Sequence, residues 1–368
     1  MWQIINNPTW DNIYNTFDWV QDMAATPQDA LYHAEGDVAI HTKMVLEALL
    51  QLPEYQALSQ QDQYILFAAA LLHDVEKRST TITEPDGRIA SPGHAKKGEY
   101  TARRLLYQDI PAPFLVKEAV AKLVRYHGLP LWVFDKPNPQ KALLQTSLEV
   151  NTAHLALLAR ADVLGRICTD QADLLYKIDL FEEFCKEQQC WGQARQFPSD
   201  LARFHYFQKE ESYPDYEPFD DTRVDVVMIA GLPGVGKDTF IRKYYPKTTV
   251  LSLDDLRRQL KIDPTDKSGN GTVIQMIKQE AKRLLAKQQP FIWNATNITR
   301  QMRGQLMDLF LTYKAKVKII YLEVPYERLV LQNDDRDHPV PPAVLERMIA
   351  RLEVPSPVEA HEVRLVFE

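Results

Sequence analysis

A glycine-rich turn between an apolar run and a helical segment is the feature that most constrains how this chain folds. Residues 224–240, VDVVMIAGLPGVGKDTF, read as a strand, a turn and the start of a helix. Glycines let the backbone amides curl around phosphate oxygens, and a helix N-terminus adds partial positive charge. The turn therefore predicts an α/β domain that binds the phosphates of a nucleotide.

The residues around this turn indicate how the phosphates are held. Lys237 follows the last glycine and can reach the transferred phosphoryl group. Asp238 stands where serine or threonine usually supplies a hydroxyl to Mg²⁺, so the ligand is either Asp238, directly or through water, or its neighbour Thr239. Asn294 likewise stands where a carboxylate often ends the corresponding strand. We expect the nucleotide to contact Gly231, Gly234, Gly236, Lys237, Asp238 and Thr239.

Short apolar runs follow the turn and alternate with helical segments. These runs are TVLSL, PFIWNA and KVKIIYLEV, and the alternation is typical of βαβ units around a mainly parallel sheet. The segment SLDDLR places Asp254 and Asp255 after a strand, at the edge of the sheet where doubly wound folds bind ligands. A carboxylate there can accept a hydroxyl proton, and for Asp255 a helix-starting carboxylate is the other interpretation. Arg336 precedes two prolines, a setting that suits a mobile lid.

The first half of the chain has a different pattern. Its apolar residues recur at helical spacing almost throughout, so we expect an all-α domain over residues 1–207. Residues 208–223, QKEESYPDYEPFDDTR, are charged and aperiodic and contain proline, as in an interdomain connection. The α/β domain then covers residues 224–368. Two domains of this size are the usual expectation for a chain of 368 residues.

Histidines are concentrated in the helical half. Six of the nine lie at positions 33, 41, 73, 94, 127 and 154. His73 and Asp74 are adjacent at the end of a strongly apolar helix, where two polar groups are unfavourable unless something pairs with them. Imidazole and carboxylate are natural ligands of divalent transition metals, so the pattern indicates a metal site.

Five segments of this half, in order, resemble the HD-domain phosphohydrolase superfamily over most of residues 30–170. They are IHTKMVLEAL, LLHDVEK, PGHAKKGE, RYHG and RADVLGR. The resemblance implies one or two divalent transition-metal ions, whose identity the sequence leaves open. It makes His41, His73, Asp74 and Asp162 ligands of one metal, and His94 and His127 ligands of a second, with Asp74 available to bridge. His33 is either a further ligand or a substrate contact, and Lys77 and Arg166 neutralise the phosphate.

The second half resembles the 5′-OH polynucleotide kinase branch of P-loop phosphotransferases over residues 224–353. The resemblance is carried by GLPGVGKDT, DDLR, NATN, the lid arginine and the following VP. It implies ATP or another NTP with Mg²⁺ as the phosphoryl donor. Asp254 would be the general base, Lys237 and Arg336 would stabilise the transition state, Arg257 would contact the acceptor phosphate, and Val340 would lie near the adenine.

The domain order and both motif sets look like the bacterial fusion of an HD phosphohydrolase with a P-loop polynucleotide kinase. Such an enzyme heals broken RNA: it removes a 2′,3′-cyclic, 2′- or 3′-phosphate and phosphorylates the 5′-OH. The partners implied are RNA ends, with DNA ends as the alternative, and an RNA ligase acting downstream. Two other readings stay open, namely a nucleotidase joined to a nucleoside or small-metabolite kinase, and an ATP-gated RNA-binding or sensor protein with degenerate sites.

Composition limits the remaining possibilities. A formal charge of −7 argues against a general polyanion binder but is compatible with a site that grips only a strand end. The sequence has no basic leader and no apolar stretch long enough to span a bilayer, so we expect a cytoplasmic protein without a membrane partner. Cys168, Cys185 and Cys190 are too few and too irregularly spaced for a disulfide framework.

Overall fold

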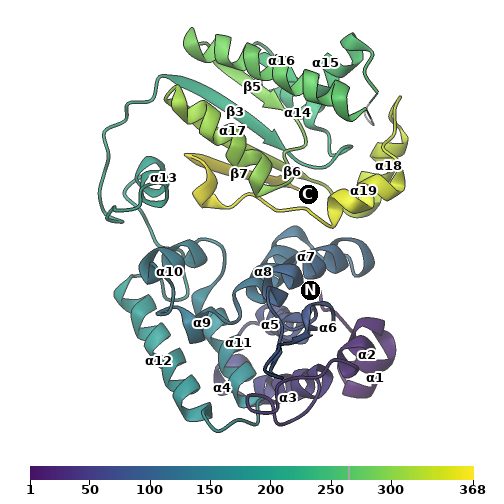
Figure 1. The fold of residues 1–368 in the computed structure, drawn as a ribbon, viewed down its shortest axis with the longest axis vertical. Helices are drawn as coiled ribbons and strands as arrows, with labels where there is room; N and C mark the ends of the chain where they lie inside the picture. Colours follow the sequence, from purple (N-terminus) through teal and green to yellow (C-terminus); the bar gives the residue numbers. More distant parts are fainter. Residues whose placement is uncertain (264–265) are drawn as a thin grey trace. The chain divides into compact units, whose positions relative to one another are not determined.

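Two compact units make up the chain in the computed structural model, which describes residues 1–263 and 266–368 (Figure 1). The first unit is Met1–Gln196 and the second is Phe197–Glu368, and each has its own apolar core. The first unit is helical apart from a short hairpin, and the second is built on a parallel sheet. The predicted order, an all-α domain followed by an α/β domain, is therefore confirmed.

The N-terminal unit is a helical assembly around one central helix, α5. Its hairpin pairs β1 with β2 in antiparallel fashion. The elements of this unit are α1 (Trp10–Thr16), α2 (Asp18–Ala24), α3 (Val38–Gln51), α4 (Pro53–Gln56), α5 (Gln60–Leu72), α6 (Lys77–Thr80), β1 (Ile82–Thr83), β2 (Ile89–Ala90), α7 (His94–Arg104), the π-helix η1 (Leu105–Asp109), α8 (Phe114–Tyr126), α9 (Leu129–Trp132), α10 (Pro139–Ser147), α11 (Thr152–Leu164) and α12 (Gln171–Glu187).

Helix α5 is buried on every side from Ile65 onward, because its sequence is apolar all round after a polar first turn. The hydroxyl of Ser59 caps its first turn by accepting the N–H of Asp62. Every residue from 65 to 72 is buried, and the helix packs against α3, α8 and α11. The C-terminal end of α5, which leads into His73 and Asp74, therefore lies inside the unit.

The C-terminal unit contains a five-stranded sheet of order β4-β5-β3-β6-β7, with every neighbouring pair parallel. Parallel strands need crossover connections, and helices supply them here. The elements are α13 (Asp200–Gln208), β3 (Val224–Ala230), α14 (Lys237–Tyr244), β4 (Thr249–Ser252), α15 (Leu253–Leu260), α16 (Lys267–Ala286), β5 (Phe291–Asn294), α17 (Arg300–Thr312), β6 (Ala315–Glu323), α18 (Tyr326–Asp334), α19 (Pro342–Ile349), the 3₁₀ helix η2 (Pro357–Glu359) and β7 (Glu362–Phe367).

Helix α13 groups with the C-terminal unit, although the sequence places it in the helical domain ending at residue 207. The guanidinium of Arg203 donates to the carbonyls of Pro357 and His361, at 3.2 and 2.8 Å. The ring of Phe204 lies 4.2 Å from that of His361, centroid to centroid. Helical spacing alone could not show this grouping, because these partners lie more than 150 residues away.

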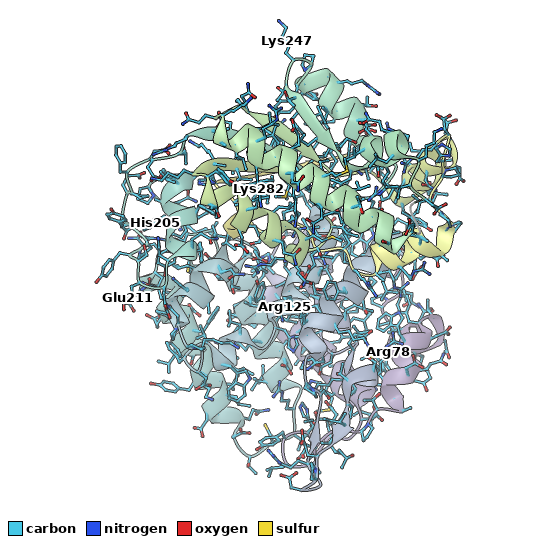
Figure 2. All side chains as sticks on the ribbon, turned by 45° about the horizontal axis from the view of Figure 1, so that its top comes forward. Arg78, Arg125, His205, Glu211, Lys247 and Lys282 are labelled. Carbon is cyan, nitrogen blue, oxygen red and sulfur yellow. The ribbon has the colours of Figure 1, made fainter. Side chains whose placement is uncertain are left out.

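The surface of each unit carries charged side chains around its apolar core. Lys247, in the turn after α14, and Lys282, on α16, are exposed lysines of the C-terminal unit (Figure 2). Among the described residues, no helix combines the length and apolar character needed to cross a bilayer.

Candidate functional sites

The end of α5 brings a histidine and an aspartate into the interior of the N-terminal unit. His73 is 1% exposed and Asp74 is 2% exposed. Helices α3, α7, α8 and α11 direct the other predicted ligands toward them. The seven residues predicted to bind metal are drawn together here: His33, His41, His73, Asp74, His94, His127 and Asp162.

Asp74 lies between two groups of ligands. Its Oδ1 is 3.4 Å from His94 Nε2 and 3.8 Å from His127 Nε2. Its Oδ2 is 3.2 Å from His73 Nε2 and 3.8 Å from His41 Nε2. His41 Nε2 is in turn 3.1 Å from Asp162 Oδ1. Asp74 Oδ2 thus faces His73 and His41, and its Oδ1 faces His94 and His127.

Backbone hydrogen bonds fix the tautomers of three histidines. The Nδ1 atoms of His73, His94 and His127 lie 2.7, 2.7 and 2.8 Å from the carbonyl oxygens of Ala70, Ser91 and Val124. A carbonyl can only accept, so each Nδ1 carries a proton and the neutral ring keeps its lone pair on Nε2. These Nε2 atoms face Asp74. Backbone acceptors of this kind commonly orient metal-binding histidines.

Two buried atoms at the centre of the cluster, His73 Nε2 and Asp74 Oδ1, have no hydrogen-bond partner among the residues that the structure describes. Buried polar atoms are rarely left unsatisfied, and an ion is one of the usual reasons. Both atoms offer lone pairs of the type that divalent transition metals bind. The residues present therefore fit the metal that the sequence predicts.

The ionisation of two carboxylates and one histidine favours metal binding at this cluster, whereas the pKa of His73 is raised because Asp74 outweighs the effect of burial. Burial alone would raise the pKa of Asp74, but neighbouring His73 and Lys77 hold it well below its usual range. Burial would likewise raise the pKa of Asp162, but neighbouring Arg166 and His41 hold it well below its usual range. Burial, reinforced by His73 and His94, lowers the pKa of His127 to about 3. At neutral pH the carboxylates are thus ionised and the His127 ring is neutral, which are the forms that bind metals.

Glu35 is a site residue that the sequence analysis did not single out. Its Oε1 accepts from His33 Nδ1 at 2.8 Å and lies 2.9 Å from His41 Nδ1, while its Oε2 accepts the Ile167 N–H at 2.9 Å. One carboxylate therefore orients two histidines from the turn before α3. The only sequence signal was its position between His33 and His41, which does not separate it from an ordinary turn glutamate.

A cavity of about 330 Å³ opens beside the metal cluster. The two predicted phosphate-binding cations line it. Lys77 Nζ is 2.8 Å from Asp74 Oδ2, and Arg166 contacts Asp162 through two nitrogens at 2.6 and 3.0 Å. The complete lining is Gln28, Asp29, Tyr32, His33, Lys77, Ile89, Ser91, His94, Trp132, Arg166, Asp170 and Leu174.

In the C-terminal unit, the glycine turn joins β3 to α14 as predicted. Gly231 has a φ of +145°, and a Cβ there would lie 2.5 Å from the carbonyl oxygen of Leu322, so only glycine fits. Lys237 begins α14, and its ammonium donates to the carbonyls of Gly231 and Leu232 at 3.1 and 2.8 Å. Burial lowers the pKa of Lys237 to about 8, against the opposing charges of Asp254 and Asp238 and with a contribution from Arg336.

Asp238 and Thr239 differ in their surroundings. The side-chain nitrogen of Asn294, at the end of β5, donates to Asp238 Oδ1 at 2.7 Å. The hydroxyl of Thr239 instead accepts from Arg242, one turn further along α14, at 3.1 Å. The structure thus directs Asp238, rather than Thr239, toward the end of the neighbouring strand.

The predicted acceptor residues lie at the start of α15. Asp254 forms an ion pair with Arg257, whose Nε also donates to Asn270 Oδ1 at 2.6 Å. Asp255 instead pairs with Arg258 and its N–H donates to Ser252 Oγ, consistent with the predicted helix-starting role.

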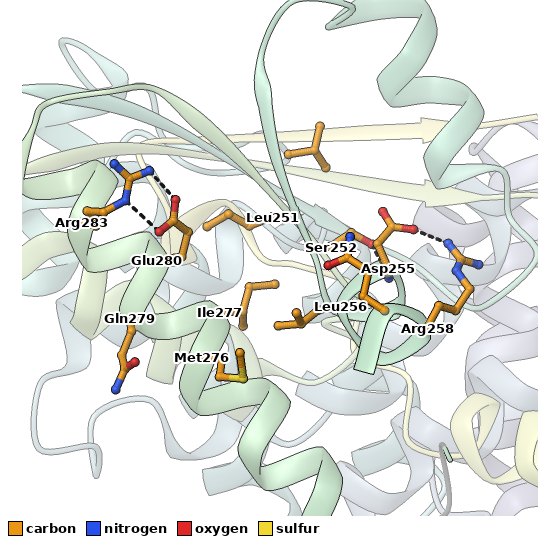
Figure 3. A pocket seen from close by; sticks show the side chains of 12 residues that line it. Leu251, Ser252, Asp255, Leu256, Arg258, Met276, Ile277, Gln279, Glu280 and Arg283 are labelled. Carbon is orange, nitrogen blue, oxygen red and sulfur yellow. Dashed lines mark hydrogen bonds and ion pairs between the residues drawn. The ribbon is translucent and has the colours of Figure 1, made fainter. Parts of the chain in front are cut away.

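A second cavity, of about 770 Å³, lies between α15 and α16 (Figure 3). Leu251, Leu256 and Ile277 line its apolar part, and the Asp255–Arg258 and Glu280–Arg283 pairs border it.

The segment after α18 carries the predicted lid residues Arg336 and Val340. Asn333, which is 3% exposed, donates to the Val340 carbonyl at 2.9 Å and accepts the Val340 N–H at 3.0 Å. The segment is therefore closed into a loop by one side chain. Asn333 also borders the nucleotide turn, because a Cβ on Gly234 would lie 3.3 Å from its backbone nitrogen. The sequence analysis missed Asn333, which no motif marks.

Comparison with known proteins identifies a family model in each unit. Residues 38–173 match the HD domain, and residues 226–355 match the AAA domain. Among solved structures, a putative kinase from Chloroflexus aurantiacus J-10-fl is 17% identical, with a TM-score of 0.34 over 40% of this chain and 89% of that one. A Pnkp1/Rnl/Hen1 complex and a Pnkp1/Rnl/Hen1 RNA repair complex are 20% and 21% identical, with TM-scores of 0.29 and 0.32. These two matches cover 36% and 38% of this chain, and the chain spans only 43% and 47% of theirs.

Proposed function

Because the chain joins an HD domain to a kinase-like AAA domain, we propose that it is a bifunctional enzyme that heals RNA ends. The HD unit removes a 2′,3′-cyclic, 2′- or 3′-phosphate, and the kinase unit transfers a phosphoryl group from an NTP to a 5′-OH. The observation that carries the proposal is that each unit has its own set of phosphate-handling groups, one around Asp74 and one around Lys237.

In the HD unit, the cluster would hold one or two divalent transition-metal ions. Such ions, when bound, polarise phosphoryl oxygens and lower the pKa of bound water. The protein's own cations have a separate task. Lys77 and Arg166 line the cavity, supply positive charge for the phosphate, and keep Asp74 and Asp162 ionised. His33 is proposed as a substrate contact or a further ligand, which is supported by its position in the cavity lining and its hydrogen bond to Glu35.

In the kinase unit, the acceptor hydroxyl oxygen attacks the γ-phosphorus, the bond to the leaving NDP breaks, and Asp254 accepts the hydroxyl proton. Lys237 and Arg336 stabilise the charge on the migrating group. Arg257 contacts the acceptor phosphate, Val340 lies near the adenine, and the glycine turn holds the donor phosphates. Asp238, oriented by Asn294, is the better placed of the two candidate contacts to Mg²⁺.

Two opposed activities in one chain are useful only if they act on different phosphates. On the same phosphate, the kinase and the phosphohydrolase would together only hydrolyse ATP. On opposite ends of a break they leave a 3′-OH and a 5′-phosphate, the ends that a downstream RNA ligase joins. RNA ends are therefore the proposed substrates, with DNA ends as the alternative.

The test uses an RNA oligomer that carries a 5′-OH and a 2′,3′-cyclic phosphate. It is incubated with ATP, Mg²⁺ and each of several transition metals in turn, and both ends are analysed. We expect a metal-dependent loss of the terminal phosphate and a gain of 5′-phosphate. No change at either end would refute the proposal. Faster phosphorylation of free nucleosides than of oligomers would favour the alternative, a nucleotidase joined to a nucleoside or small-metabolite kinase.

A further inference from the structure

Two exposed aromatic side chains lie on the wall of the HD cavity. Trp132, at the end of α9, is 46% exposed, and Tyr32, in the turn before α3, is 48% exposed. Both line the cavity that contains Lys77, Arg166 and His94. Large aromatic surfaces left open beside charged groups are typical of binding sites, because burying them on a ligand is favourable.

The position of Trp132 is set by the same segment that supplies a predicted metal ligand. His127 ends α8, and after one intervening residue α9 runs to Trp132. From α12, Leu174 lines the same cavity, and the ammonium of Lys177 lies 4.1 Å from the centroid of the Trp132 ring. A cation at this distance from a ring stabilises its orientation. The orientation of the Trp132 indole is therefore fixed by Lys177, and the ring lies close to the metal cluster.

The polar groups of the cavity limit what can lie against these rings. The Asp29 carboxylate accepts the N–H groups of Leu31 and Ile89, at 3.0 Å each, so it shapes the wall. The amide of Gln28 is already engaged, since its oxygen accepts from Lys77 Nζ at 2.8 Å and its nitrogen donates to the Asp37 carbonyl at 3.3 Å. Asp170 precedes α12 and makes no side-chain capping hydrogen bond. It also lines the cavity, where a carboxylate suits hydroxyl or amino groups of a ligand. The positive charge comes from Lys77 and Arg166, each already paired with a carboxylate, which suits a ligand with few phosphates.

We propose that the aromatic wall binds the base of the terminal nucleotide while its phosphate lies against Lys77 and Arg166. The HD site then selects a nucleotide end over other phosphate esters, with Trp132 as the main stacking surface and Tyr32 as the second. This inference rests on the proposed phosphohydrolase function and deepens it, because it assigns the chemical class of the substrate to residues of the cavity.

The test compares adenosine 3′-monophosphate with glycerol 2-phosphate, a phosphate ester that has neither a base nor a ribose ring. For Trp132→Ala we expect kcat/KM on the nucleotide to fall roughly tenfold to a hundredfold, the range for one base stack. The value for glycerol 2-phosphate should stay within about twofold, and Trp132→Phe should retain most of the nucleotide activity. The control is Tyr176→Ala, since Tyr176 is 62% exposed on α12 but does not line the cavity.

A binding measurement gives a second readout that needs no turnover. The fluorescence of 2-aminopurine riboside 3′-phosphate should be quenched on binding to the full-length wild-type protein and to Tyr176→Ala, and less so on binding to Trp132→Ala. Equal losses on both substrates, or no loss on either, would overturn the base-binding role. A wild-type enzyme that cleaves glycerol 2-phosphate as well as the nucleotide would also overturn it while leaving the phosphohydrolase intact. Failure on every phosphate ester would instead refute the proposed function itself.

Discussion

The position of Lys237 follows from the glycine motif, whereas its pKa follows from the residues that bury it. The motif places its ammonium at the glycine turn, and burial then lowers its pKa to about 8. Burial disfavours the charged form, whereas donor phosphates would favour it. Between pH 8 and the ordinary lysine pKa near 10.5, the nucleotide-free protein therefore lacks a proton that the bound state needs.

Nucleotide binding at pH 8.5 should consequently be accompanied by net proton uptake. The measurement is titration calorimetry with MgADP in buffers of different ionisation enthalpy. Lys237→Met should abolish the uptake, and Lys243→Met, which removes an exposed lysine of the same helix, should preserve it. Proton uptake of equal size in Lys237→Met would show that another group titrates.

Single residues also show where sequence reasoning stopped. His73 and Asp74 were found because an apolar helix ends in two polar groups, and Lys237 because glycines precede it. Glu35, Trp132 and Asn333 carry no such signal. Each acquires its environment from a residue that is distant in the chain, such as Ile167 for Glu35 and Lys177 for Trp132, or from a loop that the side chain itself closes.

Among the elements, α18 and the segment after it connect the nucleotide turn to the lid. The Asn333 side chain holds Val340 through two hydrogen bonds to the Val340 backbone. The loop that contains Arg336 therefore depends on one buried amide.

Asn333→Ala should impair the kinase more than an exposed substitution next to it. Losing the two part-buried hydrogen bonds removes the side chain that pairs the Val340 N–H and carbonyl, and because these groups are partly open to solvent the cost is below the roughly 1–3 kcal/mol of a fully buried unsatisfied group. We expect a lower kcat and a higher KM for ATP in 5′-phosphorylation, with unchanged phosphate release. Asp334→Ala is the matched control, since Asp334 is exposed at the end of α18. Equal activity in both variants would contradict the positioning role of Asn333.

The attachment of α13 should make the C-terminal unit sensitive to acid. His361 accepts the Val317 N–H at 3.1 Å, and burial lowers its pKa from 6.5 to about 4. The folded state thus excludes a proton that the unfolded state binds. Stability is complete above pH 6.5 and is lost as the pH falls toward 4, by on the order of 3 kcal/mol. Urea unfolding should show a flatter pH dependence for His361→Gln than for the wild type.

The control for this prediction is His338→Gln, which removes an exposed histidine of the same unit. It should retain the wild-type pH dependence. If His361→Gln lost stability between pH 6.5 and 4 as steeply as the wild type, another group would be responsible. The structural reason for expecting His361 is that its ring packs against Phe204 of α13 and that the residue is only 4% exposed.

At the scale of the whole molecule, the sequence predicted the order of the two architectures and the centre of each site. The change in apolar period near residue 224 marks where the sheet begins, because β-strands and helices bury their faces at different spacings. The sequence could not assign α13, since a helix has the same periodicity whichever core it joins. It also could not show the cavity walls, which are assembled from segments between Gln28 and Leu174.

The central hypothesis for this protein is that one chain acts on the two ends of a broken RNA through two independent sites. The most direct measurement follows both ends of one RNA oligomer, bearing a 5′-OH and a 2′,3′-cyclic phosphate, with Asp74→Ala and Lys237→Ala compared with the wild type. We predict that Asp74→Ala abolishes phosphate removal and spares 5′-phosphorylation, and that Lys237→Ala does the reverse. Loss of both activities from either substitution in a folded protein would contradict the claim.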